Sequence, residues 1–266
     1  MSAAIERFEP RQTKVTARLS EQGAMLEELR TVIPTLQPER ARADVRKAIL
    51  EDNVLRRPSI ASRKKVFKKL SARYFRADTP QATARLVAAL QRESDPIQVG
   101  LYAYTMLLWN DALIFHLGCD WLAPKLGRAP FEVEASDVED ELKRLSKRFP
   151  EIKKWSQSTR QKVSTHYLSL LRDCGFATGA VRKHLRRPYI SPEVVLFGAQ
   201  LVTGGGEPPA NILEHPLFTA MGLSVEDVIS ALTELQQHGH IEFAIQGGAV
   251  YFKEELEKKS AYECKL

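Results

Sequence analysis

The sequence has few cysteines and no leader-like N-terminus. Among its 266 residues only Cys119, Cys174 and Cys264 are cysteines, an odd number that forms no C-x-x-C pair. This count excludes a disulfide framework and indicates a reducing, cytoplasmic setting. The first ten residues carry three charged side chains and no apolar run, so we expect no signal peptide.

No stretch is long and apolar enough to be expected in a membrane. The most apolar segment, 97–123, is interrupted by Asp111 after 14 uncharged residues and again by Asp120. A membrane-spanning helix needs about 20 consecutive apolar residues, so this segment predicts a buried helix and no membrane contact. Hydrophobic residues make up 44% of the chain, which is enough for a sizeable core, and the length indicates about two domains.

Motifs of enzymes and of metal sites are missing as well. The sequence contains no G-x-x-x-x-G-K-[ST] phosphate loop, no G-x-S-x-G elbow and no H-E-x-x-H pair. His116 and Cys119 have the spacing of two metal ligands, but they stand alone in an apolar segment, which favours core packing. His238 and His240 flank a glycine without a cysteine or an acidic cluster to complete a zinc site. We therefore expect a non-enzymatic protein without a metal or another cofactor.

The charge that is present is distributed unevenly. The whole chain carries 39 Lys and Arg against 33 Asp and Glu, a net charge of +6. Residues 1–80 have a net charge of +8, residues 81–150 of −2, residues 151–190 of +7 and residues 191–266 of −7. Two basic blocks separated by a weakly acidic segment indicate local anionic partners, which a uniformly basic surface would not.

Apolar periodicity, helix caps and turn residues predict a mainly α-helical bundle that contains winged helix-turn-helix-like units with small β-hairpins. We divide it into an N-terminal helical domain, 1–150, with a basic helix-turn-helix-like segment at about 39–77, and a C-terminal winged-helix-like domain, 151–266. Helices are expected at residues 20–33, 39–55, 59–76, 79–92, 96–117, 136–149, 156–174, 193–201 and 224–238. Short strands are expected at 180–185 and 189–190, and a terminal hairpin at 241–245 and 249–252.

Three local signals fix where some of these helices begin and end. Ser59 is expected to cap the helix that follows it. Ser136 and Glu139 have the spacing of a capping box. Gly175 is expected to end the 156–174 helix in a left-handed conformation.

The first basic block, residues 53–77, has nine Lys and Arg and no Asp or Glu. On a helix, Lys65, Lys69, Arg73 and Arg76 form one row beside an apolar side. Like charges without acidic partners repel one another, and this repulsion is relieved when phosphates replace counterions. The candidate DNA ligands are Arg56, Arg57, Ser59, Ser62, Arg63, Lys64, Lys65, Lys68, Lys69 and Arg73. The alternative is a solvated basic face without a ligand.

The second basic block has the order helix, Gly175 turn, short strand, basic loop and short strand, which is typical of a winged helix-turn-helix unit. A recognition helix presents its N-terminal residues to base edges, where Arg160 could bind guanine and Gln161 adenine. The candidates on this helix are Ser158, Thr159, Arg160, Gln161, Lys162 and Thr165, and those on the wing are Arg182, Lys183, Arg186 and Arg187. The alternative is a structural helix with a solvated basic hairpin.

Two groups of residues form recognisable signatures. The first group is Asn53, Val54, Leu55, Ser59, Ser62, Arg63, Arg73 and Tyr74. The second group is Trp155, Ser156, Ser158, Thr159, Leu170, Leu171, Arg172, Asp173 and Gly175. Together they resemble the signatures of the BrxA family, a small subunit of the bacteriophage exclusion (BREX) phage-defence systems. The resemblance implies a mostly helical, non-enzymatic accessory subunit that works beside a DNA methyltransferase, an ATPase and a phosphatase-like protein. It also implies a likeness of part of the fold to RNA-binding antitermination factors.

The sequence thus predicts an accessory subunit that binds double-stranded DNA mainly through its phosphates. Two other functions stay open: a protein–protein adaptor within the defence complex, and an RNA-binding protein. The acidic C-terminal helix and hairpin would be repelled by DNA, so we expect them to bind a protein or to pack against the basic unit. The DNA hypothesis further requires that the two basic blocks meet on one surface.

Overall fold

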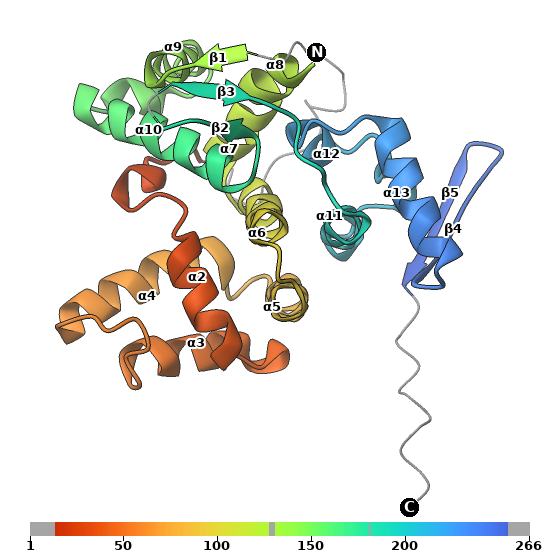
Figure 1. Cartoon of the computed structure of the whole chain (residues 1–266), viewed down its shortest axis with the longest axis horizontal. Coiled ribbons are helices and arrows are strands. Elements are labelled where there is room, and N and C mark those ends of the chain that lie inside the picture. Colours follow the sequence, from red (N-terminus) through yellow and green to blue (C-terminus); the bar gives the residue numbers. More distant parts are fainter. Residues whose placement is uncertain (1–13, 128–130, 181, 255–266) are drawn as a thin grey trace, which may run out of the picture.

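The computed structural model describes residues 14–127, 131–180 and 182–254, and it is mainly helical (Figure 1). The N-terminal elements are η1 (Arg18–Glu21), α2 (Leu26–Val32), η2 (Ile33–Thr35), η3 (Pro38–Arg40), α3 (Ala41–Leu50), α4 (Ile60–Tyr74) and α5 (Pro80–Arg92). The central elements are α6 (Pro96–Asn110), α7 (Ala112–His116), η4 (Leu117–Leu122), α8 (Ala123–Leu126), β1 (Phe131–Val133), α9 (Ala135–Leu145), η5 (Pro150–Lys154), α10 (Gln157–Asp173), β2 (Ala177–Thr178) and β3 (Lys183–Leu185). The C-terminal elements are α11 (Pro192–Gly204), η6 (Pro209–Asn211), α12 (Pro216–Ala220), α13 (Val225–Gln237), β4 (Ile241–Gln246) and β5 (Ala249–Glu254). The predicted fold class, mainly α with small antiparallel sheets, is confirmed.

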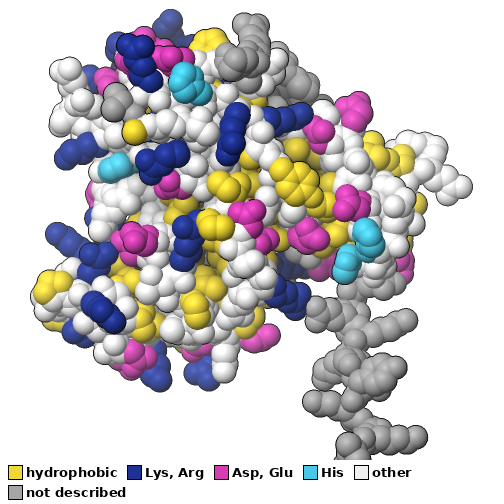
Figure 2. All heavy atoms as spheres, in the orientation of Figure 1, with side chains coloured by type: hydrophobic (Ala, Val, Ile, Leu, Met, Phe, Trp, Pro, Cys, Tyr) yellow, Lys and Arg dark blue, Asp and Glu magenta, His cyan; other side chains and the backbone are white. Residues whose placement is uncertain are grey.

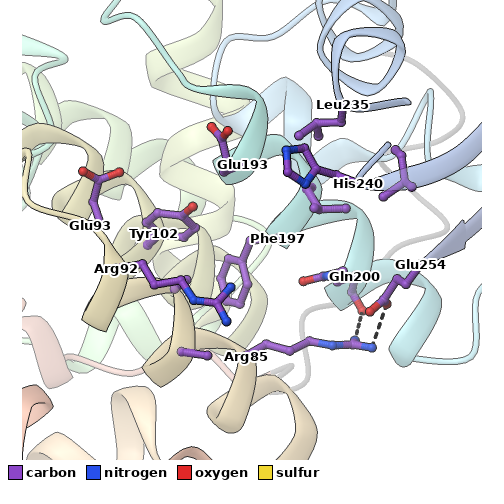
Figure 3. A pocket seen from close by; sticks show the side chains of 14 residues that line it. Arg85, Arg92, Glu93, Tyr102, Glu193, Phe197, Gln200, Leu235, His240 and Glu254 are labelled. Atoms are coloured by element: carbon purple, nitrogen blue, oxygen red, sulfur yellow. Dashed lines mark hydrogen bonds and ion pairs between the residues drawn. The ribbon is translucent and has the colours of Figure 1, made fainter. Parts of the chain in front are cut away.

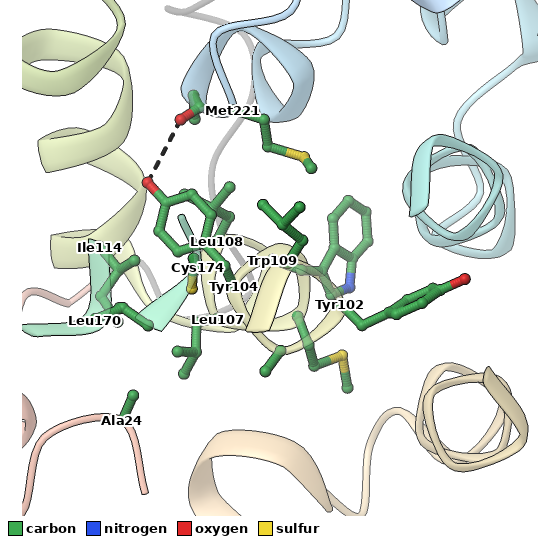
Figure 4. Close-up of a cluster of buried hydrophobic side chains, with 14 of the residues drawn as sticks. Ala24, Tyr102, Tyr104, Leu107, Leu108, Trp109, Ile114, Leu170, Cys174 and Met221 are labelled. Atoms are coloured by element: carbon green, nitrogen blue, oxygen red, sulfur yellow. Dashed lines mark hydrogen bonds between the residues drawn. The ribbon is translucent and has the colours of Figure 1, made fainter. Parts of the chain in front are cut away.

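The centre of the molecule is α6, whose residues from Gln98 to Asn110 are all buried. A helix that is apolar on every side lies inside a protein, because it has no polar face to turn to water. Figure 4 shows its side chains radiating in all directions, among them Tyr102, Tyr104 and Trp109. The hydroxyl of Tyr104 donates to the carbonyl of Ala220 at 3.4 Å. Because α6 contacts α4, α5, α10, α11 and α12, it joins the N-terminal and C-terminal parts in one core.

A single helix was expected over 96–117, and this expectation is wrong at Asp111. The residue has extended backbone, and its side chain accepts hydrogen bonds from the N–H groups of Leu113 at 2.9 Å and Ile114 at 3.3 Å. It therefore ends α6 and begins α7 as an N-cap. Burial raises the pKa of Asp111, although these two hydrogen bonds act against the rise. None of the helices in the described ranges has the length and apolarity needed to cross a membrane.

The three-stranded sheet has the order β1-β3-β2, with both pairings antiparallel. Phe131 pairs with Leu185 and Val133 with Lys183, while Ala177 on the other side also pairs with Leu185. The helices α9 and α10 lie between β1 and β2 in the chain and pack against one another. The sheet therefore joins segments on both sides of residue 150, where we placed a domain boundary. The division into two domains stays a prediction.

The C-terminal hairpin is confirmed, and it projects from the body beside α13 (Figure 1). Ile241 pairs with Glu254 and Gln246 with Ala249. Gly247 and Gly248 form the turn with φ values of 56° and 81°. Both values are positive, as the two central residues of a type I′ hairpin turn require.

Three other expectations about local structure are wrong. The expected 20–33 helix is split, because η1 and α2 are separated by a turn in which Met25 has a φ of 59°. The start of α9 is not capped by Ser136: the N–H of Glu134 donates to the carboxylate of Asp137 at 2.7 Å. Residues 189–190 form no strand but belong to a segment without regular secondary structure between β3 and α11.

Candidate nucleic-acid interface

The turn between α3 and α4 is built by residues of the first family-like signature. Asn53 has a φ of 51°, its side-chain oxygen accepts from the N–H of Arg57 at 2.8 Å, and its amide nitrogen donates to the Arg57 carbonyl at 3.1 Å. Ser59 caps α4 as expected, since its hydroxyl accepts from the N–H of Ser62 at 3.2 Å. Both residues therefore have a structural role, and for Ser59 the predicted role as a cap is confirmed while its role as a DNA ligand stays a prediction.

Two arginines beside this turn hold helices together. Arg57 forms an ion pair of 2.8 Å with Glu28 on α2, and Arg63 donates to the carbonyl of Leu50 at 3.1 Å. Arg56, in contrast, is exposed. Of the arginines before and at the start of α4, only Arg56 is left with its charged group free of such contacts within the described ranges.

The predicted exposed row on α4 is wrong for two of its four members. Arg73 is buried and donates to the carbonyls of Lys69 at 3.1 Å and Arg18 at 2.9 Å, and burial lowers its pKa. The ammonium of Lys69 lies 3.2 Å from the carboxylate of Glu21 and 3.0 Å from its carbonyl. Both side chains thus hold η1 against α4. Arg76 faces solvent in part and pairs with Asp78 at 2.7 Å.

Three lysines remain on the outer face of α4. Lys64, Lys65 and Lys68 are exposed, and none of them has a hydrogen bond or an ion pair within the described residues. Helical geometry places them around Ala61 and Ala72, opposite the buried side of Val66 and Leu70. This part of the first basic block keeps its charge available for an anion.

The first residues of the second family-like signature form the start of α10. The hydroxyl of Ser156 accepts from the N–H of Thr159 at 3.1 Å and lies 3.0 Å from the hydroxyl of Ser158. Arg160, the residue that we expected to read guanine, folds back and donates to the carbonyl of Trp155. Its guanidinium therefore supports the turn before the helix in this conformation.

The exposed face of α10 is polar and free of acids until its last residue. Val163, Tyr167 and Leu171 bury the opposite side of the helix. The predicted residues that share the exposed face are Ser158, Gln161, Lys162 and Thr165, and this face continues through Ser169 to Arg172. Arg172 itself pairs with Asp173 at 2.9 Å.

The predicted basic wing is largely neutralised. Arg182 lies 3.2 Å from each of the carboxylates of Glu132 and Glu134, next to β1. Lys183 is buried, burial lowers its pKa, and its ammonium donates to the carbonyl of Ala180 at 2.7 Å. The position of Lys183 contradicts its prediction as a DNA ligand, because its charge is enclosed by the turn between β2 and β3.

Arg186 and Arg187, the other two predicted wing arginines, directly follow β3 and lie in different environments. Arg187 pairs with Asp227 at 2.8 Å and also donates to the carbonyl of Gly222. Arg186 is exposed, and its Nε donates to the carbonyl of Gly175 at 3.0 Å without a carboxylate partner within the described residues. It therefore adds a positive charge at the C-terminal end of α10.

The two basic blocks are joined by η1, which lies between α4 and α10 (Figure 1). Arg73 on α4 binds the carbonyl of Arg18, and the Nδ1 atom of His166 on α10 lies 2.7 Å from the carbonyl of Leu19. Figure 2 shows dark blue and magenta groups interspersed on the face drawn there. This face therefore has no continuous basic track of the kind that we expected.

A cleft with a volume of about 510 Å³ lies elsewhere, between α5, α6, α11 and the C-terminal hairpin (Figure 3). Tyr102 and Phe197 lie in it with their ring centres 5.6 Å apart, and burial raises the pKa of Tyr102. Arg85 donates to the Gln200 carbonyl at 2.9 Å and pairs with Glu254 at 2.7 Å, so it ties α5 to α11 and to β5. In the ranges that the structure describes, no three His, Cys, Asp or Glu residues are grouped as metal ligands would be.

Comparisons with known proteins agree with the fold and with the two signatures. The fold is similar to that in the crystal structure of an uncharacterized protein from Magnetospirillum magneticum, with a TM-score of 0.59 and 16% identity over 80% of this chain and 99% of that chain. No curated protein matches the chain. The sequence model of the BrxA family matches residues 14–199. Since this match covers well over half of the 266 residues, the chain belongs to the BrxA family and is thereby associated with BREX phage defence.

Proposed function

We propose that the protein is a non-enzymatic, DNA-binding accessory subunit of its BREX system and that α10 is its DNA-reading helix. The exposed face of α10 carries this proposal. It presents the hydroxyl, amide and ammonium groups of Ser158, Gln161, Lys162 and Thr165 without an acidic side chain among them. These groups can donate to and accept from base edges in the major groove, where each base pair has its own pattern.

The elements around α10 support this assignment. The chain order β1, α9, α10, β2, β3 and the sheet order β1-β3-β2 are typical of winged helix-turn-helix units. In such units the second helix enters the major groove, and here that helix is α10. The loop between β2 and β3 would then act as the wing. Arg182 in this loop and Lys183 at the start of β3 have internal partners, so we propose that phosphate contacts come mainly from other residues.

The other phosphate contacts are assigned to exposed lysines. Lys162 lies on the proposed reading face, and Lys64, Lys65 and Lys68 lie on the outer face of α4. Their ammonium groups have no protein partner within the described residues, so a phosphate can replace their counterions without breaking an ion pair. Each such replacement releases a counterion, and the affinity for DNA should therefore fall steeply with salt.

A protein–protein adaptor is the second candidate. It is favoured by the internal pairing of Arg57, Arg182 and Arg187, because these pairs leave fewer cations for a nucleic acid than the sequence alone indicated. An RNA duplex is a weaker candidate, because A-form RNA has a deep and narrow major groove that a helix cannot enter. Within the BREX complex, the methyltransferase, the ATPase and the phosphatase-like subunit are the proposed protein partners.

The test measures binding of the full chain to a labelled DNA duplex by fluorescence anisotropy at several salt concentrations. A variant with Gln161→Ala, Lys162→Ala and Thr165→Ala is compared with a control that carries Lys47→Ala, Gln236→Ala and Gln237→Ala. The control also replaces one exposed lysine and two exposed polar residues, but on α3 and α13. We expect the first variant to lose at least about tenfold in affinity, as the loss of one to two base or phosphate contacts predicts, and the control to bind as the wild type does.

The same measurements separate the alternatives. No binding of duplex DNA at low salt, or equal binding by both variants, would contradict the proposal. Stronger binding of an RNA duplex of the same sequence in direct competition would favour the RNA-binding function. Co-purification with other BREX proteins that survives nuclease treatment, together with no binding of DNA, would favour the adaptor.

A further inference from the structure

The segment between β3 and α11 is fixed to the body at nearly every residue. The backbone N–H of Arg186 donates to the carbonyl of Phe176 at 2.9 Å, and its side chain donates to that of Gly175. Arg187 is bound to Asp227 and Gly222. The ring of Pro188 packs on Gly175, where an added Cβ would lie 3.2 Å from the Pro188 Cβ.

A buried amide completes the anchoring. The side chain of Gln98, on α6, is 6% exposed. Its Nε2 donates to the carbonyl of Tyr189 at 3.0 Å, and its Oε1 accepts from the N–H of Ser191 at 3.1 Å. Ser191 then caps α11 through its hydroxyl. A buried glutamine that uses both ends of its amide on one segment holds the backbone of that segment in place.

One aromatic side chain in the middle of this rigid segment is exposed to solvent. Tyr189 is 73% exposed, more than any other large hydrophobic residue in the described ranges. A single exposed apolar residue on a mobile loop needs no explanation, but here the backbone on both sides is bound. A ring presented from a fixed backbone loses little conformational entropy when it binds, which is a property of residues that anchor a partner.

The position of Tyr189 favours a nucleic acid as that partner. Arg186, three residues earlier, is bound to the carbonyl of Gly175 directly after α10 and has no carboxylate partner within the described residues. The segment therefore begins beside the C-terminal end of α10, where Arg172 pairs with Asp173. A DNA that lies on the exposed face of α10 and extends past this end would reach the cation Arg186 and, three residues later in the chain, the aromatic Tyr189.

Base stacking determines which kind of DNA the ring of Tyr189 could bind. A base inside a perfect duplex has both faces covered by its neighbours, so an external ring cannot stack on it. An unpaired base has a free face, and stacking on an aromatic side chain is independent of its identity. We propose that Tyr189 is a stacking platform that gives the α10 site a preference for duplex DNA carrying an unpaired base. This inference rests on the proposed function of α10.

The experiment compares two duplexes of one sequence, one intact and one with a single bulged nucleotide, for binding to the full chain. We expect the wild type to prefer the bulged duplex by about tenfold, the size of effect that one stacked base gives, and Tyr189→Ala to abolish this preference while binding the intact duplex normally. Tyr189→Phe should keep the preference, because it retains the ring. Tyr251→Ala is the matched control, since Tyr251 is 51% exposed but lies on the C-terminal hairpin.

A second measurement detects the stacking itself. With 2-aminopurine as the bulged base, its fluorescence should be quenched by the wild type and by Tyr189→Phe, but not by Tyr189→Ala. Equal affinity of the wild type for both duplexes, or a preference that survives Tyr189→Ala, would overturn the inference while leaving the DNA-binding function intact. Binding of neither duplex would instead show that the proposed function itself fails, and the stacking role with it.

Discussion

Arg73 and His166 bind two successive carbonyl groups of one short turn. The guanidinium of Arg73, on α4, donates to the carbonyl of Arg18 at 2.9 Å, and Nδ1 of His166, on α10, lies 2.7 Å from that of Leu19. The turn is η1, which precedes both helices in the chain and lies between them. The two blocks that the sequence marks as basic are thereby connected through backbone groups, and some of their cations serve this connection.

Arg73→Ala should destabilise the fold. The substitution removes a buried guanidinium together with its hydrogen bonds to the carbonyls of Arg18 and Lys69, which costs on the order of 3 kcal/mol. The urea concentration at the midpoint of unfolding should fall accordingly, while the slope of the unfolding free energy against urea concentration stays unchanged. Lys65→Ala on the exposed side of the same helix should change the free energy of unfolding by less than about 0.5 kcal/mol. Equal stability of the two variants would show that Arg73 is not a structural residue.

The lysines on α4 should affect the salt dependence of DNA binding. Replacing Lys64, Lys65 and Lys68 by Ala should lower the slope of log affinity against log salt by about 0.9 for each phosphate contact that is lost, or nearly 3 in all. The control replaces Arg40, Arg46 and Lys143, three exposed cations that already have acidic partners on the surface. A slope that the first variant and the control change to the same extent would exclude the outer face of α4 as a phosphate-binding surface.

His215 should make the fold less stable in acid. Burial lowers its pKa to about 4, below the 6.5 of an unfolded histidine. The unfolded chain therefore takes up a proton near pH 6.5 that the folded chain takes up only near pH 4. The stability that neutral His215 contributes is complete above pH 6.5 and is lost as the pH falls towards 4, by about 3 kcal/mol in total.

The hydrogen bonds of His215 agree with this direction and suggest the variant. Its Nδ1 accepts from the N–H of Leu217 at 3.2 Å, which a doubly protonated ring cannot do. Asn at this position can still cap α12 but does not titrate. His215→Asn should therefore flatten the fall in unfolding free energy between pH 6.5 and 4, whereas His238→Asn, at an exposed site, should not. Parallel pH profiles of the wild type and His215→Asn would refute this assignment.

Signals between neighbours in the chain predicted their elements well. Ser59 caps α4 as expected, and Gly175 ends α10 with a φ of 79°. The exposed face of α10 also followed from its apolar spacing, because the buried positions of one helix define the opposite face. The apolar pattern marks Asp111 only as a charge that interrupts an apolar run. A short polar side chain directly before a helix can also be its N-cap, and this is the role that Asp111 has in the structure.

Contacts between distant segments could not be predicted in this way. The carboxylates that neutralise Arg182 come from Glu132 and Glu134, and they reach it only because β1 pairs with β3 about fifty positions later in the chain. The burial of Arg73 likewise depends on the carbonyl of Arg18 in η1, a residue that precedes the helix expected at 20–33. Charge counts along the chain therefore overestimated how many cations are free.

Gly175 should be required for both the stability and the surface of the α10 unit. Its φ of 79° disfavours any side chain, and a Cβ there would lie 2.9 Å from Cγ2 of Ile97 and 3.2 Å from the Cβ of Pro188. Gly239 is a matched control, because it follows α13 with a φ of 74° and has open space around it. Gly239→Ala therefore measures the backbone cost alone, about 1 kcal/mol, and Gly175→Ala should cost about 1–3 kcal/mol more because of overpacking.

The two glycine variants also report on the segment after β3. An alanine at position 175 can be accommodated only if Ile97 or Pro188 moves, and Pro188 precedes the exposed ring of Tyr189. If Pro188 yields, Gly175→Ala should lower the preference for a bulged duplex as well as the melting temperature, whereas Gly239→Ala should change only the latter. Equal losses of stability in the two variants would mean that the close packing of Pro188 on Gly175 contributes nothing to the fold, and the rigidity assigned to the segment would then have to come from Gln98 and from the contacts of Arg186 and Arg187.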